Sequence, residues 1–232
     1  RHKDHKPYGV KPSMLEESTE ELVRHLQNPI GWWRDTAQKI ILLRPDREKA
    51  IPLLEGLFRF TQSPLPRMHA LWTLNGMNAL TTEIKREALA DRSPVLRRAM
   101  VQMIESALPD QLELLVSLEK ERDPQVAEQL VFTLGTIDHP KAEELIQSLA
   151  ATHLADKGVM LATTVSLWGK KDLPLVEQLK SSKVFAKLPQ SKRASVNMDW
   201  DKALSSWDRG MKFDKDFDVT HRKMIQTGEK LY

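Results

Sequence analysis

Apolar residues recur along most of this chain with the spacing of an α-helix. Two stripes show the spacing: Val95, Ala99, Met103 and Ile104, and Leu161, Thr164, Val165 and Trp168. Side chains at such offsets share one face of a helix that has 3.6 residues per turn. No useful length of chain alternates apolar and polar residues as a β-strand does. The pattern therefore predicts an all-α protein.

A template that opens with proline repeats about every thirty residues. Pro29, Pro64, Pro94 and Pro124 each follow an Asn, Ser or Asp residue, and an apolar helical stripe follows each proline. Asn, Ser and Asp side chains accept hydrogen bonds from free N–H groups at a helix start, and proline fits the first turn. Each unit is thus expected to begin with a capped helix, and a fifth unit begins near Asp156 without its proline.

Shorter helical patterns lie between these starts and supply a second helix for each unit. They cover residues 47–60, 81–90, 110–120, 140–154 and 172–182. A leading helix opens with Ser18 and Glu21, which have the spacing of a capping box. Because one pair of short helices cannot bury its apolar faces alone, neighbouring pairs must stack. We therefore expect a right-handed α-solenoid of about five HEAT-like helix pairs, with a leading helix and an irregular C-terminal tail; the prolines argue against a continuous coiled coil.

The sequence divides into three parts. Residues 14–188 carry the repeats, whereas residues 1–13 are polar and are interpreted as a linker or the end of a preceding domain. Residues 189–232 contain scattered apolar residues and several aspartates, which is typical of a linker or of a tail wrapped on the array. Because the chain does not begin with methionine, we expect it to be a segment of a longer protein.

Composition excludes several kinds of chemistry. The chain has no cysteine, so disulfides, cysteine-ligated zinc, thiol nucleophiles and haem attachment through CxxCH are excluded within these residues. Its 35 Lys and Arg interleave with 32 Asp and Glu, and the net charge of +3 describes a mixed, solvated surface. No apolar run approaches the roughly 18 residues of a membrane span, so no direct membrane insertion is expected. Motifs of hydrolases and nucleotide-binding loops are absent. We expect no catalytic residue, metal or cofactor in this segment.

Trp32, Trp33, Arg34 and Asp35 form the most unusual cluster. One role is structural, in which one ring packs against the leading helix and the other closes the end of the array. The other role is a partly exposed aromatic surface that, with Arg34, contacts a partner domain or a stacked base. Adjacent helical residues point about 100° apart, so both rings should not be buried together. All four are therefore candidate partner-binding residues.

Arg34, Arg67 and Arg97 occupy equivalent positions in successive units. Stacking should align them, and two roles fit. In a structural ladder, each arginine bonds an acidic side chain or a helix-end carbonyl of the adjacent unit; in a cationic strip, all three bind phosphate or an acidic partner. Ala127 stands where a fourth arginine would be, which weakens the strip. The ladder is the favoured prediction.

His69 and Trp72 lie one helical turn apart and complete the set of candidate partner-binding residues. A lone histidine in such a helix is usually buried and hydrogen-bonded, and no HxxxH or HExxH pattern accompanies it. His2 and His5 have metal-capable spacing with Asp4, but they belong to a polar terminal stretch. No metal site is predicted from either group.

Several blocks resemble one protein family. The stretches HKDHKP, STEELVRHLQNPIGWWRDTAQKIIL and SPLPRMHALWTLNGM resemble the middle region of planctomycete-type membrane-bound dehydrogenase and haem-binding proteins. In that family a β-propeller similar to glucose/sorbosone dehydrogenases is followed by HEAT repeats and then by a c-type cytochrome domain. The resemblance covers nearly the whole chain, and GWWRDTAQ and HALWTL are its specific part.

The resemblance implies a connecting role. Residues 1–13 would close the propeller and TGEKLY would open the cytochrome domain, so haem c is expected only in the domain that follows. The implied partners are these flanking domains or other proteins, and the implied location is the periplasm or cell envelope. This segment would be the non-catalytic scaffold of an electron-transfer protein.

Two other functions stay open. A HEAT-like DNA-binding enzyme of the alkylpurine DNA glycosylase type is also a small basic helical array, but it would need a groove lined with Lys and Arg. Acidic residues such as Glu119, Glu121 and Asp123 stand among the bases here, so no nucleic-acid binding is predicted. A stand-alone protein-interaction adaptor differs from the connector mainly in lacking flanking domains.

Overall fold

The computed structural model describes residues 13–166, 181, 183–187, 189–191, 193 and 194. Every regular element in this part is helical, which confirms the predicted all-α fold. The elements are α1 (Thr19–His25), α2 (Gly31–Leu43), the 3-10 helix η1 (Arg47–Ala50), α3 (Ile51–Phe60), α4 (Pro64–Gly76), α5 (Thr82–Leu89), α6 (Pro94–Glu105), α7 (Leu112–Val116), α8 (Pro124–Gly135), α9 (Pro140–Thr152), α10 (Lys157–Ser166) and α12 (Lys183–Ala186).

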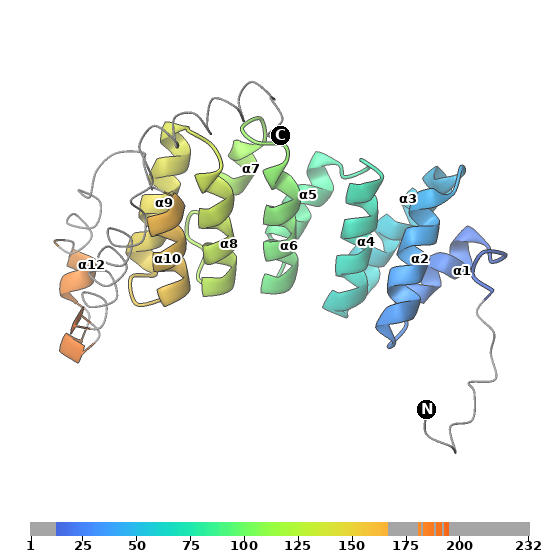
Figure 1. The fold of residues 1–232 in the computed structure, drawn as a ribbon, viewed down its shortest axis with the longest axis horizontal. Coiled ribbons are helices and arrows are strands. Elements are labelled where there is room, and N and C mark those ends of the chain that lie inside the picture. Colours follow the sequence, from blue (N-terminus) through green and yellow to red (C-terminus); the bar gives the residue numbers. More distant parts are fainter. Residues whose placement is uncertain (1–12, 167–180, 182, 188, 192, 195–232) are drawn as a thin grey trace, which may run out of the picture.

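The helices form two layers along one long axis (Figure 1). In one layer α2, α4, α6, α8 and α10 lie side by side, and each contacts the next. The second layer consists of α1, α3, α5, α7 and α9, and contacts such as those of α3 with α4 and of α5 with α6 join the two layers. Stacked helix pairs produce this double row. A right-handed HEAT-like solenoid remains our interpretation of it.

An apolar seam runs between the layers and through the whole array. Its largest fully buried side chains are Phe58, Leu22, Leu26, Ile41, Leu54, Leu71, Leu74, Ile84, Leu96, Met100, Ile104 and Leu115. These residues come from helices of both layers, so each helix depends on its neighbours to remove its apolar face from water.

Proline opens three helices as predicted, but the side-chain caps differ. α4, α6 and α8 begin at the expected prolines. In α8, Asp123 Oδ1 accepts from the N–H groups of Gln125 and Val126 at 3.0 and 3.2 Å. Ser63 and Ser93 accept no such bond, so the predicted caps of α4 and α6 are wrong. Proline lacks an N–H group, which leaves these helix starts with one donor fewer to satisfy.

Two other predicted helix starts are confirmed. At α1, the N–H of Ser18 donates to Glu21 Oε2 at 2.8 Å, and the N–H of Glu21 donates to Ser18 Oγ at 3.2 Å. At α10, the N–H of Val159 donates to Asp156 Oδ1 at 3.0 Å. The fifth unit therefore begins at the expected aspartate.

The first unit begins two residues later than the template predicts. The template makes Asn28 the N-cap, but α2 starts at Gly31. Asn28 Oδ1 accepts from the N–H of Ile30 at 2.9 Å and closes a turn before the helix. With this start, Arg34 is the fourth residue of α2 and Trp32 is the second. Arg67 and Arg97 are likewise the fourth residues of α4 and α6.

Part of the predicted core stripes is wrong. Leu161 and Val165 are 50% and 42% exposed, and Val95 is 50% exposed. The packed face of α10 instead carries Val159, Met160, Ala162 and Thr163. When a short helix carries apolar residues on two faces, the spacing of these residues in the sequence does not show which face packs against the neighbouring helices.

Several predictions concern residues outside the described part of the chain. These residues include Trp168, all but Ser181 of the helix expected at residues 172–182, and residues 1–12 and 195–232. Among the helices that the structure describes, none has the length and apolar character of a bilayer-spanning segment.

Phe58 and Phe60 offer a matched test of the seam. Both lie at the end of α3, but Phe58 is 1% exposed and Phe60 is 81% exposed. Phe58→Ala should lower the free energy of unfolding by about 3–5 kcal/mol, because it removes a buried ring and leaves a cavity. Phe60→Ala should change it by less than about 0.5 kcal/mol. Urea denaturation followed by circular dichroism measures both, and equal losses would contradict this placement of the seam.

Candidate functional site

Trp32 and Trp33 start α2 and have different surroundings. Trp32 is 53% exposed, whereas Trp33 is half-buried and packs against the core. The two rings meet edge to face, with centroids 5.4 Å apart and an angle of 89°. His25, the last residue of α1, stacks on Trp33 with centroids 5.0 Å apart. Trp33 thus joins α2 to α1, and Trp32 is the more exposed of the two rings.

Arg34 is engaged in bonds within the array. Its Nε donates to Nε2 of His69 on α4 at 3.1 Å. Its Nη1 donates to the carbonyl oxygens of Asn28 and Pro29 at 2.6 and 3.0 Å. The guanidinium therefore links α2 to α4 and to the loop before α2.

His69 is a buried histidine with both ring nitrogens bonded, as the sequence predicts. Nδ1 lies 2.9 Å from Oε1 of Gln38 on α2. Because a guanidinium only donates, Nε2 must accept from Arg34, so the ring is neutral and its Nδ1–H donates to Gln38. Burial lowers the pKa of His69, Arg34 lowers it further, and Asp35 opposes them. The ring has a structural role between two helices.

Arg67 makes the second set of ladder contacts. Its Nε donates to the carbonyl oxygen of Phe58 at 2.7 Å, and its guanidinium lies over the Phe58 ring, 5.0 Å from the centroid. An Nη2 hydrogen bond to Asp91 joins α4 to the loop that precedes α6. Both charged side chains are largely buried, so this pair is shielded from solvent.

Arg97 makes the third set of ladder contacts. Nε and Nη2 donate to the two carboxylate oxygens of Glu121 at 2.7 and 2.9 Å, and Nη1 donates to the carbonyl of Asp91 at 2.8 Å. Burial acts to raise the pKa of Glu121, but the bonds from Arg97 and from the Asp123 and Arg122 N–H groups outweigh it and lower the pKa. Arg67 and Arg97 thus make the predicted ladder contacts with acidic side chains. Arg34 differs, because it bonds an imidazole of the adjacent unit in place of an acidic group. The three guanidinium groups are bonded within the array and do not form a free cationic strip.

An apolar surface lies on the solvent side of the first three helices of the α2 layer. Trp32, Leu65 and Val95 are the second residues of α2, α4 and α6, and they are 53%, 40% and 50% exposed. Met68 and Trp72 follow Leu65 at offsets of three and seven on the same face of α4 and are partly buried. We call these five residues the α2–α4–α6 face.

Only part of this face was predicted from the sequence. Trp32 and Trp72 were candidate partner-binding residues, whereas Val95 was placed on an apolar stripe and Leu65 and Met68 were not candidates. The available signal was an apolar residue next to the opening proline in successive units. Asp35, the remaining candidate, is exposed one turn along α2 from Trp32.

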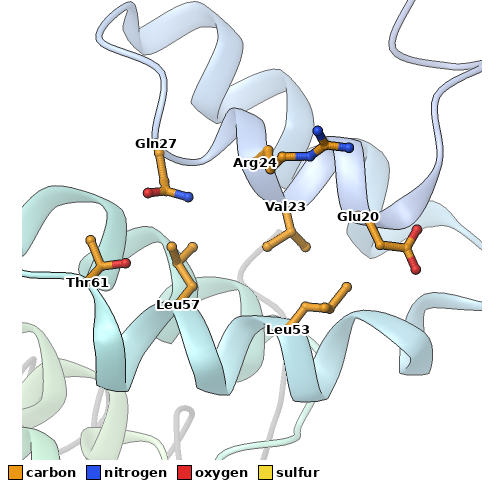
Figure 2. A pocket seen from close by; sticks show the side chains of 7 residues that line it. All are labelled: Glu20, Val23, Arg24, Gln27, Leu53, Leu57 and Thr61. Atoms are coloured by element: carbon orange, nitrogen blue, oxygen red, sulfur yellow. The ribbon is translucent and has the colours of Figure 1, made fainter.

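A shallow groove lies between α1 and α3, with a volume of about 360 Å³. Figure 2 shows Val23 of α1 directed toward Leu53 and Leu57 of α3, with polar side chains above and at the ends. The polar residues are Glu20, Arg24, Gln27 and Thr61. The apolar floor fits an apolar side chain.

The described residues hold no group of three or more His, Asp or Glu side chains placed to bind a metal ion. His2, Asp4 and His5 lie outside the described residues. In comparisons with known proteins, no family model, no curated protein and no solved structure matches the chain.

The Arg97–Glu121 pair gives a pH-dependent test of the ladder. Glu121→Gln should cost about 3 kcal/mol of unfolding free energy near neutral pH, because Arg97 keeps a largely buried charge without its partner. The pKa of Glu121 is lower in the folded state than in the unfolded state. The stabilisation is therefore full above the unfolded-state pKa and is lost as the pH falls through the folded-state pKa. The difference between the two proteins should thus shrink in acid.

Urea titrations of both proteins across this pH range measure the difference. Glu113→Gln is the control, because Glu113 is 76% exposed in its pair with Lys141 and should contribute less than about 1 kcal/mol at any pH. A loss for Glu121→Gln that stays constant down to acidic pH would contradict the assignment.

Proposed function

We propose that this chain is a non-catalytic helical-repeat scaffold that holds a neighbouring protein domain on the α2–α4–α6 face. The observation that carries the proposal is the row of exposed apolar side chains, Trp32, Leu65 and Val95, on three adjacent helices. A contiguous exposed apolar patch marks an interaction site more often than scattered apolar residues do. Tryptophan is also enriched among the residues that contribute most to protein binding.

The surroundings of the face fit a protein partner. Asp35, Lys39 and Arg98 are exposed and follow Trp32 or Val95 along the same helical faces. They place charges of both signs around an apolar centre. An apolar centre with a polar rim is the usual composition of a protein–protein interface.

The ladder at the starts of these helices supports this function. Arg34 and His69 join α2 to α4, and Arg67 joins α4 to the loop before α6. These contacts hold the three helices in a fixed relation before any partner arrives. A preorganised surface loses less conformational freedom on binding than a mobile one.

The family resemblance suggests which domains would be held. We propose that the scaffold connects a sugar-dehydrogenase-like β-propeller to a c-type cytochrome in an electron-transfer protein of a bacterial envelope. Haem c would belong to the cytochrome domain. A stand-alone adaptor would use the same face for a separate protein.

The DNA-binding alternative has less support. Its phosphate contacts would need free guanidinium or ammonium groups. Arg34, Arg67 and Arg97 donate instead to carbonyl, imidazole and carboxylate groups of the array. A duplex-binding assay at two salt concentrations separates the functions, because binding through phosphates weakens steeply with salt.

The docking proposal is tested by charge substitution in a longer protein that carries the flanking domains. Trp32→Glu together with Leu65→Glu should weaken domain docking on the order of tenfold or more, because carboxylates would replace the apolar centre. Limited proteolysis should become faster at the interdomain linkers, and X-ray scattering should report a larger radius of gyration. Leu161→Glu is the control, since Leu161 is 50% exposed at the other end of the array.

Two outcomes would count against the docking proposal. One is a double variant whose proteolysis and scattering profiles equal those of the unchanged protein. The other is an equal change in the Leu161→Glu control, which would point to a general effect of surface charge.

A further inference from the structure

The contact between α2 and α4 depends on the protonation state of one ring. Two side-chain hydrogen bonds join these helices, and His69 takes part in both. The bond to Gln38 uses Nδ1–H as a donor and survives in either charge state. The bond from Arg34 needs a free lone pair on Nε2, which only neutral imidazole has.

Protonation of Nε2 would reverse this interaction. The ring would then place an N–H donor where the Nε–H of Arg34 already points, at a nitrogen–nitrogen distance of 3.1 Å. Two cations would stand side by side in a site where His69 is only 9% exposed. Asp35 on α2 favours the protonated ring, but Arg34 and burial outweigh it.

Other charged groups near α4 have partners of their own. Within α4, Arg67 bonds Asp91. Charged groups on the helices packed against α4 are also bonded. Glu55 and Arg59 of α3 pair with each other. In α6, Arg97 bonds Glu121, and Glu105 bonds Thr133. On the remaining faces Lys39 of α2 and Arg98 of α6 are exposed. Arg34 and Asp35 are thus the charges that decide the state of His69.

We infer that the Arg34–His69 contact is a pH-sensitive joint, in which proton uptake at Nε2 of His69 in acid breaks the bond from Arg34 and loosens α2 from α4. Burial and the cationic neighbour lower the pKa of His69. The joint is therefore intact above the ordinary pKa of histidine and opens only as the pH falls below it.

The joint lies near the starts of two helices that carry the α2–α4–α6 face. Trp32 precedes Arg34 by two residues, and Leu65 precedes His69 by four on the same helix. Opening the joint would release α2, with its exposed tryptophan, from the row. The inference goes beyond the docking function and is tested on the free chain, so the failure of one does not decide the other.

His153 is a matched control within the same array. It is also 9% exposed, and its Nε2 lies 2.8 Å from the carbonyl oxygen of Glu121. A carbonyl only accepts, so Nε2–H of His153 donates, and this bond persists whether or not Nδ1 is protonated. Two histidines of equal exposure should thus respond differently to acid.

Amide hydrogen exchange on the full 232-residue chain tests the joint. The measured quantity is the protection of α2 amides relative to α8 amides, corrected for the intrinsic pH dependence of exchange. This protection should fall on the order of threefold to tenfold when the pH is lowered from about 7.5 to about 5. His69→Gln keeps an acceptor for Arg34 and does not titrate, so its α2 protection should not fall. His153→Gln should behave like the unchanged chain.

Either of two results would overturn the inference: pH-independent protection of α2 in the unchanged chain, or an undiminished fall in His69→Gln. Should His69→Gln fail to fold, nitrogen-15 NMR of the unchanged chain decides. The His69 ring should be the Nδ1–H tautomer near neutral pH, with a titration midpoint below that of histidine in a short peptide. A midpoint at or above that value would overturn the joint.

Discussion

The whole structure depends on mutual burial between short helices. Helices of five to thirteen residues such as α7 and α4 are too short to be stable alone in water. Each becomes stable by covering the apolar face of its neighbours, and the seam that results runs through both layers. The ladder of Arg34, Arg67 and Arg97 adds polar links between successive units at the helix starts. Stability, register and surface are therefore properties of the array.

Two adjacent tryptophans illustrate how this constraint produces a surface. One helical step rotates the side chain by about 100°, so Trp33 packs on the core and His25 while Trp32 is left in solvent. Equivalent second positions of α4 and α6 expose Leu65 and Val95 for the same reason. The array thus orders an apolar row that a single helix could not present, and this row is the surface that we propose for docking.

Sequence reasoning predicted the features that depend on local chemistry. Helix periodicity, the capping box at Ser18 and the opening prolines indicated the all-α array, and the regular spacing of arginines indicated a ladder. It failed where the outcome depends on neighbours. A turn closed by Asn28 shifted the start of α2, and Leu161 of the apolar stripe is exposed, while Val159 and Met160 pack on the array. The ladder predicted an acidic partner from the adjacent unit, as Glu121 is for Arg97, but it did not predict the imidazole of His69 as the partner of Arg34.

A crystal structure of the 232-residue chain would test the central claim most directly. The account predicts α2, α4 and α6 side by side over a continuous apolar seam, with Arg34 bonded to His69 and Trp32 in solvent. Helices packed in another order, or guanidinium groups of the three arginines facing open solvent, would contradict it.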